Sequence, residues 1–241
     1  MRSLSTTALC LLLLAACGDN GAQQQAQAAA EQAQRQQAAQ QLADQFDQAV
    51  TAQNWEMARV HGSALLDQYR DTPAAGHVLM QMERVRQRAQ AAQEQRRLAA
   101  LWNYAQVPVG KGSQRSAMID AQQRVDTDGK GPKTVQLVFR DHPAWGRSAY
   151  LVLQAGDFAK ACYRHCSVNV SVDGAAHRTM AANRPDTKDA IAMFIDDDKA
   201  LWKLAGQAKQ TLSITFPVQA GGTRTAVFET GGLDKTQMPG W

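Results

Sequence analysis

The sequence lacks the features that usually mark an enzyme or a nucleic-acid-binding protein. Its formal net charge of +4 over 241 residues is too small an excess to argue for nucleic-acid binding. Gly110-Lys111-Gly112-Ser113 does not have the spacing of a phosphate-binding loop, and none of the five histidines lies in a recognised nucleophile pattern. We therefore expect no catalysis, no cofactor and no bound metal. A hydrolase site assembled from distant residues is the alternative.

Long apolar runs are also absent, except at the start of the chain. The basic residue Arg2 precedes the apolar segment Ala8–Leu14, and two alanines follow it. This order is typical of a secretory signal peptide, and the segment is too short to span a bilayer in the mature protein. We expect residues 1–16 to be removed.

Leu14-Ala15-Ala16-Cys17 resembles the lipobox of bacterial lipoproteins. The resemblance implies cleavage before Cys17 and attachment of a diacylglyceryl group to its thiol. Several acyl chains on one cysteine would give a nearly permanent membrane anchor. Gly18, a non-acidic residue after the cysteine, favours the outer membrane over the inner one. An ordinary secretion signal with an incidental cysteine is the alternative.

Cysteine is scarce in the rest of the chain. With Cys10 removed and Cys17 acylated, only Cys162 and Cys166 remain, and in an oxidising envelope they should pair. The flanking residues look like the arms of a β-hairpin with Tyr163–His165 as its loop, so we expect a cross-strand disulfide worth about 2 kcal/mol. The alternatives are a redox pair or a metal site that includes the histidine between the cysteines, but the spacing suits neither.

The N-terminal part is predicted to be helical. Residues 21–41 are almost wholly Ala and Gln, which favour helix but offer no large side chain to bury, so residues 17–41 are predicted to be the lipid anchor and a tether, helical or disordered. A self-associating Gln-rich segment is the alternative. In residues 42–104 apolar side chains recur at helical spacing, and Asp71-Thr72-Pro73 is typical of a helix start.

Within this helical region, Asn54–Ala75 resembles one tetratricopeptide-type helix pair, with a small residue where the helices touch and a turn after Tyr69. Because a free-standing array needs about three repeats, we interpret the segment as a local helical hairpin. A cluster of arginines follows it, namely Arg84, Arg86, Arg88, Arg96 and Arg97. The cluster is either the solvated face of an amphipathic helix or a contact for anionic lipid or an acidic partner.

From residue 105 the composition changes to Val, Thr, Gly and alternating patterns. The predicted strands are Val135–Arg140, Tyr150–Leu153, Val168–Val172 and Leu212–Phe216, with weaker ones at Met118–Val125, His177–Ala181, Ile191–Ile195 and Thr225–Phe228. A short helix is predicted after Asp196–Asp198, which should cap it rather than bind calcium. The expected fold is α+β: a helical stalk and hairpin, then an antiparallel β-sandwich or open barrel over residues 105–241.

The loop around Arg140-Asp141-His142-Pro143-Ala144-Trp145-Gly146 is the most polar and aromatic one in the β region. Binding residues concentrate on loops that a rigid scaffold holds. We therefore predict that Arg140, Asp141, His142 and Trp145 contact a partner. The alternative is a plain turn with Trp145 packed against the sheet.

The segment from about Trp102 to Trp241 combines several features: Trp102-x-Tyr104, an Arg140-containing strand end, Gly156-Asp157-Phe158 before Cys162, Cys166 at the start of a strand that ends in Val172-Asp173-Gly174, and a late Gly231-Gly232-Leu233. In these the segment resembles small β-domains of the invasion-associated locus B type and of accessory lipoproteins of type VI secretion. The resemblance implies binding or assembly. We expect an envelope-anchored, non-catalytic lipoprotein whose β-domain binds an envelope protein or supports assembly of a complex. An inhibitor or immunity lipoprotein against an envelope-targeted toxin or hydrolase is the alternative.

Overall fold

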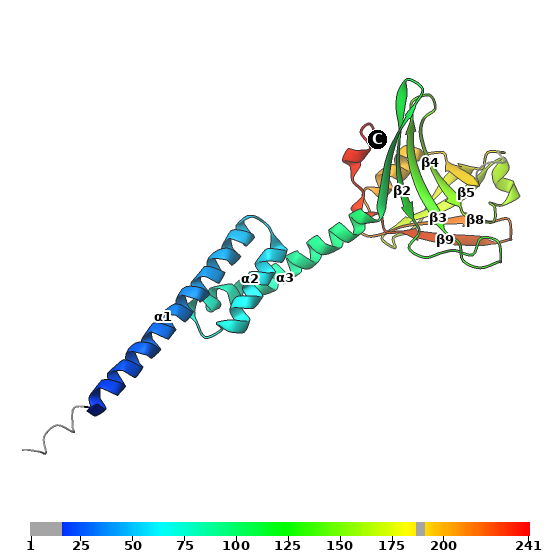
Figure 1. Ribbon diagram of the computed structural model, residues 1–241. Helices are drawn as coiled ribbons and strands as arrows, with labels where there is room; N and C mark the ends of the chain where they lie inside the picture. The colour runs from blue at the N-terminus through cyan, green and yellow to red at the C-terminus, as the bar shows by residue number, and fades with distance from the viewer. Residues whose placement is uncertain (1–15, 187–190) are drawn as a thin grey trace, which may run out of the picture. The chain divides into compact units, whose positions relative to one another are not determined.

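The computed structural model describes residues 16–186 and 191–241 (Figure 1). The chain divides into a helical unit that ends at Ala92 and a sheet unit, Gln93–Trp241. The predicted signal peptide falls on residues 1–16, of which 1–15 lie outside the described residues. The backbone of Cys17 belongs to the first helix, and its side chain lies outside the described atoms.

Three helices make up the first part of the chain: α1 Ala16–Thr51, α2 Trp55–Gln68 and α3 Pro73–Ala100. The 36 residues of α1 correspond to about 54 Å of helix at 1.5 Å per residue. Residues 20–37 of this helix are exposed, because its Ala and Gln side chains have no apolar face to bury. The segment predicted as a tether is therefore helical.

The core of the helical unit begins where large apolar side chains return in α1. Phe46 is fully buried, together with Leu65 of α2 and with Val78 and Met82 of α3. Gly62 lies at the contact of the three helices, because a Cβ at this position would collide with Met82 and stand 3.0 Å from the Phe46 ring. The small residue therefore allows the helices to approach closely.

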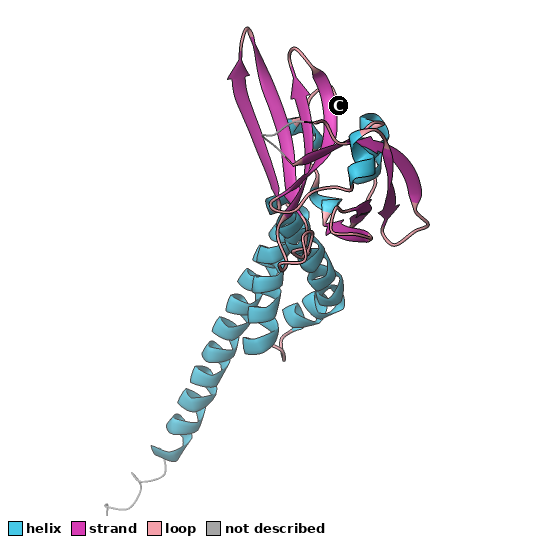
Figure 2. Cartoon of the chain, turned by 90° about the vertical axis from the view of Figure 1, so that its right-hand side faces the viewer, coloured by secondary structure: helices cyan, strands magenta, loops and turns pink. Residues whose placement is uncertain are grey.

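The second part is a nine-stranded sheet in which neighbouring strands are all antiparallel (Figure 2). The strands are β1 Trp102–Val109, β2 Gly112–Asp120, β3 Val135–His142, β4 Gly146–Leu153, β5 Cys166–Val172, β6 Arg178–Asn183, β7 Ala192–Ile195, β8 Leu212–Pro217 and β9 Thr223–Phe228. Their spatial order is β1-β2-β3-β4-β7-β6-β5-β8-β9, so the sheet is open with β1 and β9 at its edges. The expected α+β class is confirmed.

One face of the sheet carries the core of this unit. Phe139 of β3 is fully buried and meets the edges of two tryptophan rings, Trp202 at 4.9 Å and Trp241 at 5.5 Å between centroids. Trp202 belongs to α4, Asp198–Ala205, which begins where Asp197 accepts a hydrogen bond from the Ala200 amide. The predicted helix and its capping are thus present.

Two local expectations from the sequence differ from the structure. A strand, β1, begins at Trp102, inside the segment 42–104 that was expected to be helical. The cysteine hairpin is wrong, because Cys162 lies in a 3₁₀ turn, η1 Lys160–Tyr163, and only Cys166 begins a strand. The residue expected at the start of the first arm, Phe158, instead forms a bridge with Val218 after β8.

Candidate functional site

The β3–β4 hairpin presents an exposed tryptophan on a rigid turn. His142 Nδ1 accepts hydrogen bonds from the backbone N–H groups of Ala144 and Trp145, at 3.1 and 3.2 Å. The rings of His142 and Trp145 stack 3.9 Å apart and nearly parallel, while Trp145 stays 71% exposed. The buried histidine therefore fixes the turn and the indole, and Trp145 is not packed into the core.

Arg140 lies on the same outer face of the sheet, surrounded by aromatic rings. Its guanidinium carbon is 5.4 Å from the Trp145 ring centroid, 5.3 Å from that of Tyr150 and 6.0 Å from that of Phe194. Its Nε donates a hydrogen bond to Ser148 Oγ at 3.2 Å. These contacts hold the guanidinium in one place, because cation–π attraction acts from several sides. We call these four residues, Arg140, Trp145, Tyr150 and Phe194, the Arg140 cage.

The floor of the Arg140 cage is apolar. Tyr150 and Phe194 are opposite one another in the β4–β7 register, with ring centroids 4.9 Å apart, and Val138, opposite Tyr150 on β3, is buried. Burial raises the pKa of the Tyr150 hydroxyl above its ordinary value, and the charge of Arg140 offsets this only in part. The cation therefore lies against partly dehydrated surface, where its interactions are stronger than in water.

Arg140 has no acidic partner in the part of the chain that the structure describes. Other arginines do have one. They are Arg35, Arg59, Arg97, Arg178 and Arg184, each with a carboxylate oxygen within 4.0 Å. The Arg140 cage thus holds a positioned cation whose charge no described carboxylate neutralises.

The four residues predicted as a partner contact do not all lie together. Arg140, His142 and Trp145 share the outer face and its turn. Asp141 lies on the opposite face, since side chains alternate along a strand, and it is opposite Arg115 and Arg147 in the register.

Sequence reasoning missed the two cage residues Tyr150 and Phe194. Both were placed in predicted strands, and the alternation of β4 marks Tyr150 as outward-facing. The missing information was that β4 pairs with β7 rather than with the next strand along the chain.

A second cluster of polar and aromatic side chains lies beside the disulfide. Arg184 is 5% exposed, its Nε lies 2.6 Å from Asp157 Oδ1, and its guanidinium lies over the Tyr163 ring at 4.8 Å. Tyr163 also donates its hydroxyl hydrogen to Asp157 Oδ2 at 2.9 Å. Burial by itself raises the pKa of the Asp157 carboxyl, but hydrogen bonds from Arg184, Tyr163 and the Phe158 amide lower it below its ordinary value.

This second cluster fixes the local fold. Cys162 and Cys166 form the expected disulfide, with their sulfurs 2.18 Å apart. The Arg184 amide donates to the Cys162 carbonyl at 2.8 Å, which joins β6 to the 3₁₀ turn. In residues 16–186 and 191–241 no group of three or more His, Cys, Asp or Glu side chains is arranged to hold a metal ion.

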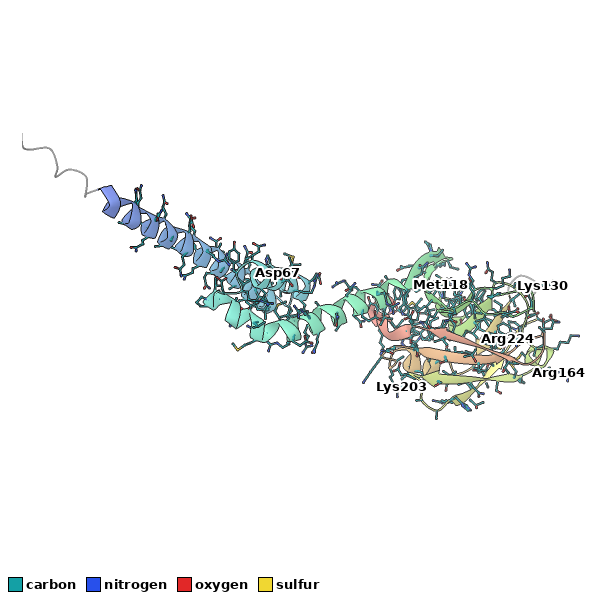
Figure 3. The ribbon with its side chains drawn as sticks, turned by 90° about the horizontal axis from the view of Figure 1, so that it is seen from below. Asp67, Met118, Lys130, Arg164, Lys203 and Arg224 are labelled. Carbon is teal, nitrogen blue, oxygen red and sulfur yellow. A yellow bond between two sulfur atoms is a disulfide. The ribbon has the colours of Figure 1, made fainter. Side chains whose placement is uncertain are left out.

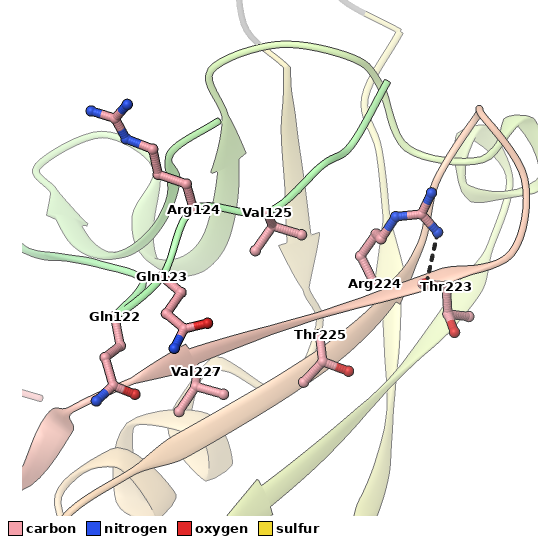
Figure 4. A pocket seen from close by; sticks show the side chains of 8 residues that line it. All are labelled: Gln122, Gln123, Arg124, Val125, Thr223, Arg224, Thr225 and Val227. Atoms are coloured by element: carbon pink, nitrogen blue, oxygen red, sulfur yellow. Dashed lines mark hydrogen bonds between the residues drawn. The ribbon is translucent and has the colours of Figure 1, made fainter. Parts of the chain in front are cut away.

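A shallow groove of about 360 Å³ runs beside the edge strand β9 (Figure 4). It is lined by residues 122–125 and by Thr223, Arg224, Thr225 and Val227. Gln122 donates its backbone N–H to the Val227 carbonyl at 2.7 Å, and Arg224 Nε donates to the Asp126 carbonyl at 2.6 Å. The lining contains two arginines and no carboxylate or histidine, so it offers no acid–base pair.

The arginines of α3, Arg84, Arg86, Arg88, Arg96 and Arg97, are all exposed. No helix in the described ranges is both long and apolar enough to cross a membrane.

No protein-family model, curated protein or solved structure matches the chain.

Proposed function

We propose that this protein is a non-catalytic lipoprotein, anchored in the cell envelope through Cys17, whose sheet unit binds an envelope protein through the Arg140 cage. The observation that carries the proposal is a cation held by aromatic rings, beside an exposed tryptophan, with no counter-ion from the described chain. Tryptophan and arginine are the residue types that contribute most at protein interfaces. The anchor rests on the lipobox-like residues Leu14-Ala15-Ala16-Cys17.

We propose further that the sheet is an incompletely closed barrel rather than a two-sheet sandwich. A single continuous strand order runs from β1 to β9. The hydrogen bond from Gln122, just after β2, to Val227 of β9 supports this interpretation, because it joins the region near one edge of the sheet to the other edge strand.

The test uses the full chain expressed in cells, with a photo-crosslinking amino acid in place of Ala144, which is exposed beside Trp145. We expect palmitate labelling of the chain and one crosslinked envelope protein. The palmitate label should disappear in Cys17→Ser, and Trp145→Ala should weaken the crosslink. A probe at Lys130, an exposed residue of another loop, is the matched control and should give no such product.

Two results would contradict the proposal: a chain that takes up no palmitate, or equal crosslinking from positions 144 and 130. Turnover of peptidoglycan, ester or peptide substrates that a single side-chain change abolishes would contradict the non-catalytic part.

The same hairpin supports a second candidate function, inhibition of an envelope-targeted toxin or hydrolase. Trp145 is held by His142 at the end of the hairpin and remains exposed, a geometry suited to insertion into an enzyme cleft. This function predicts that the crosslinked protein is an enzyme and that equimolar addition of the wild-type chain, but not Trp145→Ala, abolishes its activity. An unaffected enzyme would exclude inhibition and leave partner binding.

A further inference from the structure

We propose that the Arg140 cage recognises a carboxylate on an acidic segment of the protein partner. This inference rests on the proposed function and adds the chemistry of the bound group. Its physical basis is that Arg140 has N–H donors for which the described residues supply no acceptor.

A guanidinium carries five N–H donors in a planar fork that matches the two oxygens of a carboxylate. In Arg140 only Nε has an acceptor within the described ranges, Ser148 Oγ at 3.2 Å. The Nη groups have no acceptor there. An incoming carboxylate can therefore form two parallel hydrogen bonds without displacing an existing contact.

The aromatic rings around Arg140 prepare it for this ligand without neutralising it. The ring centroids of Trp145, Tyr150 and Phe194 lie 5.3–6.0 Å from the guanidinium carbon, and the Arg140 side chain is only partly exposed to water. A preorganised and partly dehydrated cation binds an anion more strongly than a mobile surface arginine does. The exposed Trp145 ring also offers apolar contact to a residue beside the carboxylate.

The charge of the surrounding region favours an acidic partner. The β1–β2 and β3–β4 turns lie side by side, since a Cβ on Gly112 would stand 2.8 Å from the Pro143 ring. Residues 110–116 and 140–148 together contain four Lys or Arg and one carboxylate. The resulting positive potential attracts an acidic segment and accelerates its association.

A protein carboxylate fits this site better than a lipid headgroup does. Surfaces that recognise anionic lipids gather several Lys or Arg on one face. Here Arg115 and Arg147 are at register positions opposite Asp141, on the other face of the sheet from Arg140. The cage therefore presents one cation with aromatic walls, a geometry for a single planar anion.

The test measures binding to the full-length chain with Cys17→Ser, a variant that cannot be acylated at this position. The probes are a short peptide of alternating Glu and Gly with a central Phe, its Gln-for-Glu twin, and vesicles of phosphatidylglycerol and phosphatidylcholine. The readouts are the side-chain ¹⁵N resonances of Arg140 and the dissociation constant.

We expect the Glu peptide to shift the Arg140 resonances and to bind about tenfold more tightly than the Gln twin. Arg140→Met should abolish that tenfold preference, and Arg140→Lys should restore only part of it, since Lys keeps the charge but loses the fork. Arg164→Met is the matched control. Arg164 is exposed and lies at the other end of the sheet unit from Met118, a residue of the cage side (Figure 3). Its loss should change binding less than twofold.

Equal binding of the two peptides, or equal losses in Arg140→Met and Arg164→Met, would overturn the inference. So would vesicle binding that depends on Arg140, because it would assign the cage to a lipid phosphate. If the peptides fail while the Ala144 crosslink persists, partner binding stands and carboxylate recognition falls. If the peptides bind as expected but the crosslink is absent, carboxylate recognition stands and binding of the envelope protein falls.

Discussion

Arg140 and Arg184 are both arginines stacked on aromatic rings in the same sheet unit, but they differ in what neutralises them. Arg184 is 5% exposed and pairs with Asp157 at 2.6 Å while it covers the Tyr163 ring. Arg140 is half-buried among three rings, and among the described residues no carboxylate pairs with it.

The difference follows from the cost of burying charge. An arginine that is removed almost wholly from water must find its anion within the chain, since an unpaired buried charge is strongly destabilising. An arginine at the surface can keep its outer N–H groups hydrated until a partner arrives. The Arg184 cluster therefore belongs to the fold, whereas Arg140 keeps N–H donors for which the described residues supply no acceptor.

The largest expected effect is on the stability of the fold, which should depend on Arg184 much more than on Arg140. Arg184→Met removes the cation from a buried pair and leaves Asp157 without its main partner, so we expect unfolding to become easier by about 3 kcal/mol. Denaturant unfolding followed by circular dichroism measures this change. The double variant with Asp157→Asn should recover part of the loss, because no unpaired charge then remains. An Arg184→Met protein as stable as the wild type would remove the distinction between the clusters.

The acid dependence of stability should report the same pair. The pKa of Asp157 is lower in the folded protein than in the unfolded chain, where the ordinary value is about 4. Its ionised form therefore stabilises the fold fully above about pH 4, and this contribution is lost as the pH falls through the folded pKa. We expect Asp157→Asn to flatten the acid limb of the unfolding free energy below about pH 4.

Asp157→Asn should remove only part of the decrease in unfolding free energy at acid pH. Backbone hydrogen bonds from Thr211, Lys209 and Gln210 lower the pKa of Asp173 in the same unit, so Asp173 continues to contribute. Arg140→Met is the control and should keep the wild-type limb. An acid limb that Asp157→Asn leaves unchanged would show that the pair does not govern this titration.

The sequence predicts contacts between residues that are close together in the chain better than contacts between distant strands, and the two arginine clusters contain both kinds. Arg140, His142 and Trp145 are neighbours in one turn, and turn chemistry can be interpreted from adjacent residues. Phe194 could not be assigned to them, because its pairing with Tyr150 joins strands far apart in the chain.

The Arg184 cluster was harder to predict for the same reason. The cysteine pairing was expected, but the hairpin is not formed, since the Arg184 amide, directly after β6, donates to the Cys162 carbonyl and Phe158 pairs with Val218 after β8. Strand β1 was missed because it follows α3 after a single residue, without a turn signal such as Gly or Pro between them.

The smallest expected effect is the change in stability when Arg140 is replaced, and it tests the comparison of Arg140 with Arg184 directly. Arg140→Met breaks no ion pair among the described residues, and the methionine side chain can still lie against Trp145 and Tyr150, so we expect the unfolding free energy to change by less than about 1 kcal/mol. The same variant should abolish the peptide preference described above. A loss of stability as large as that of Arg184→Met would instead mean that the cage supports the fold, because a cation that serves only binding leaves the free protein unchanged when it is removed.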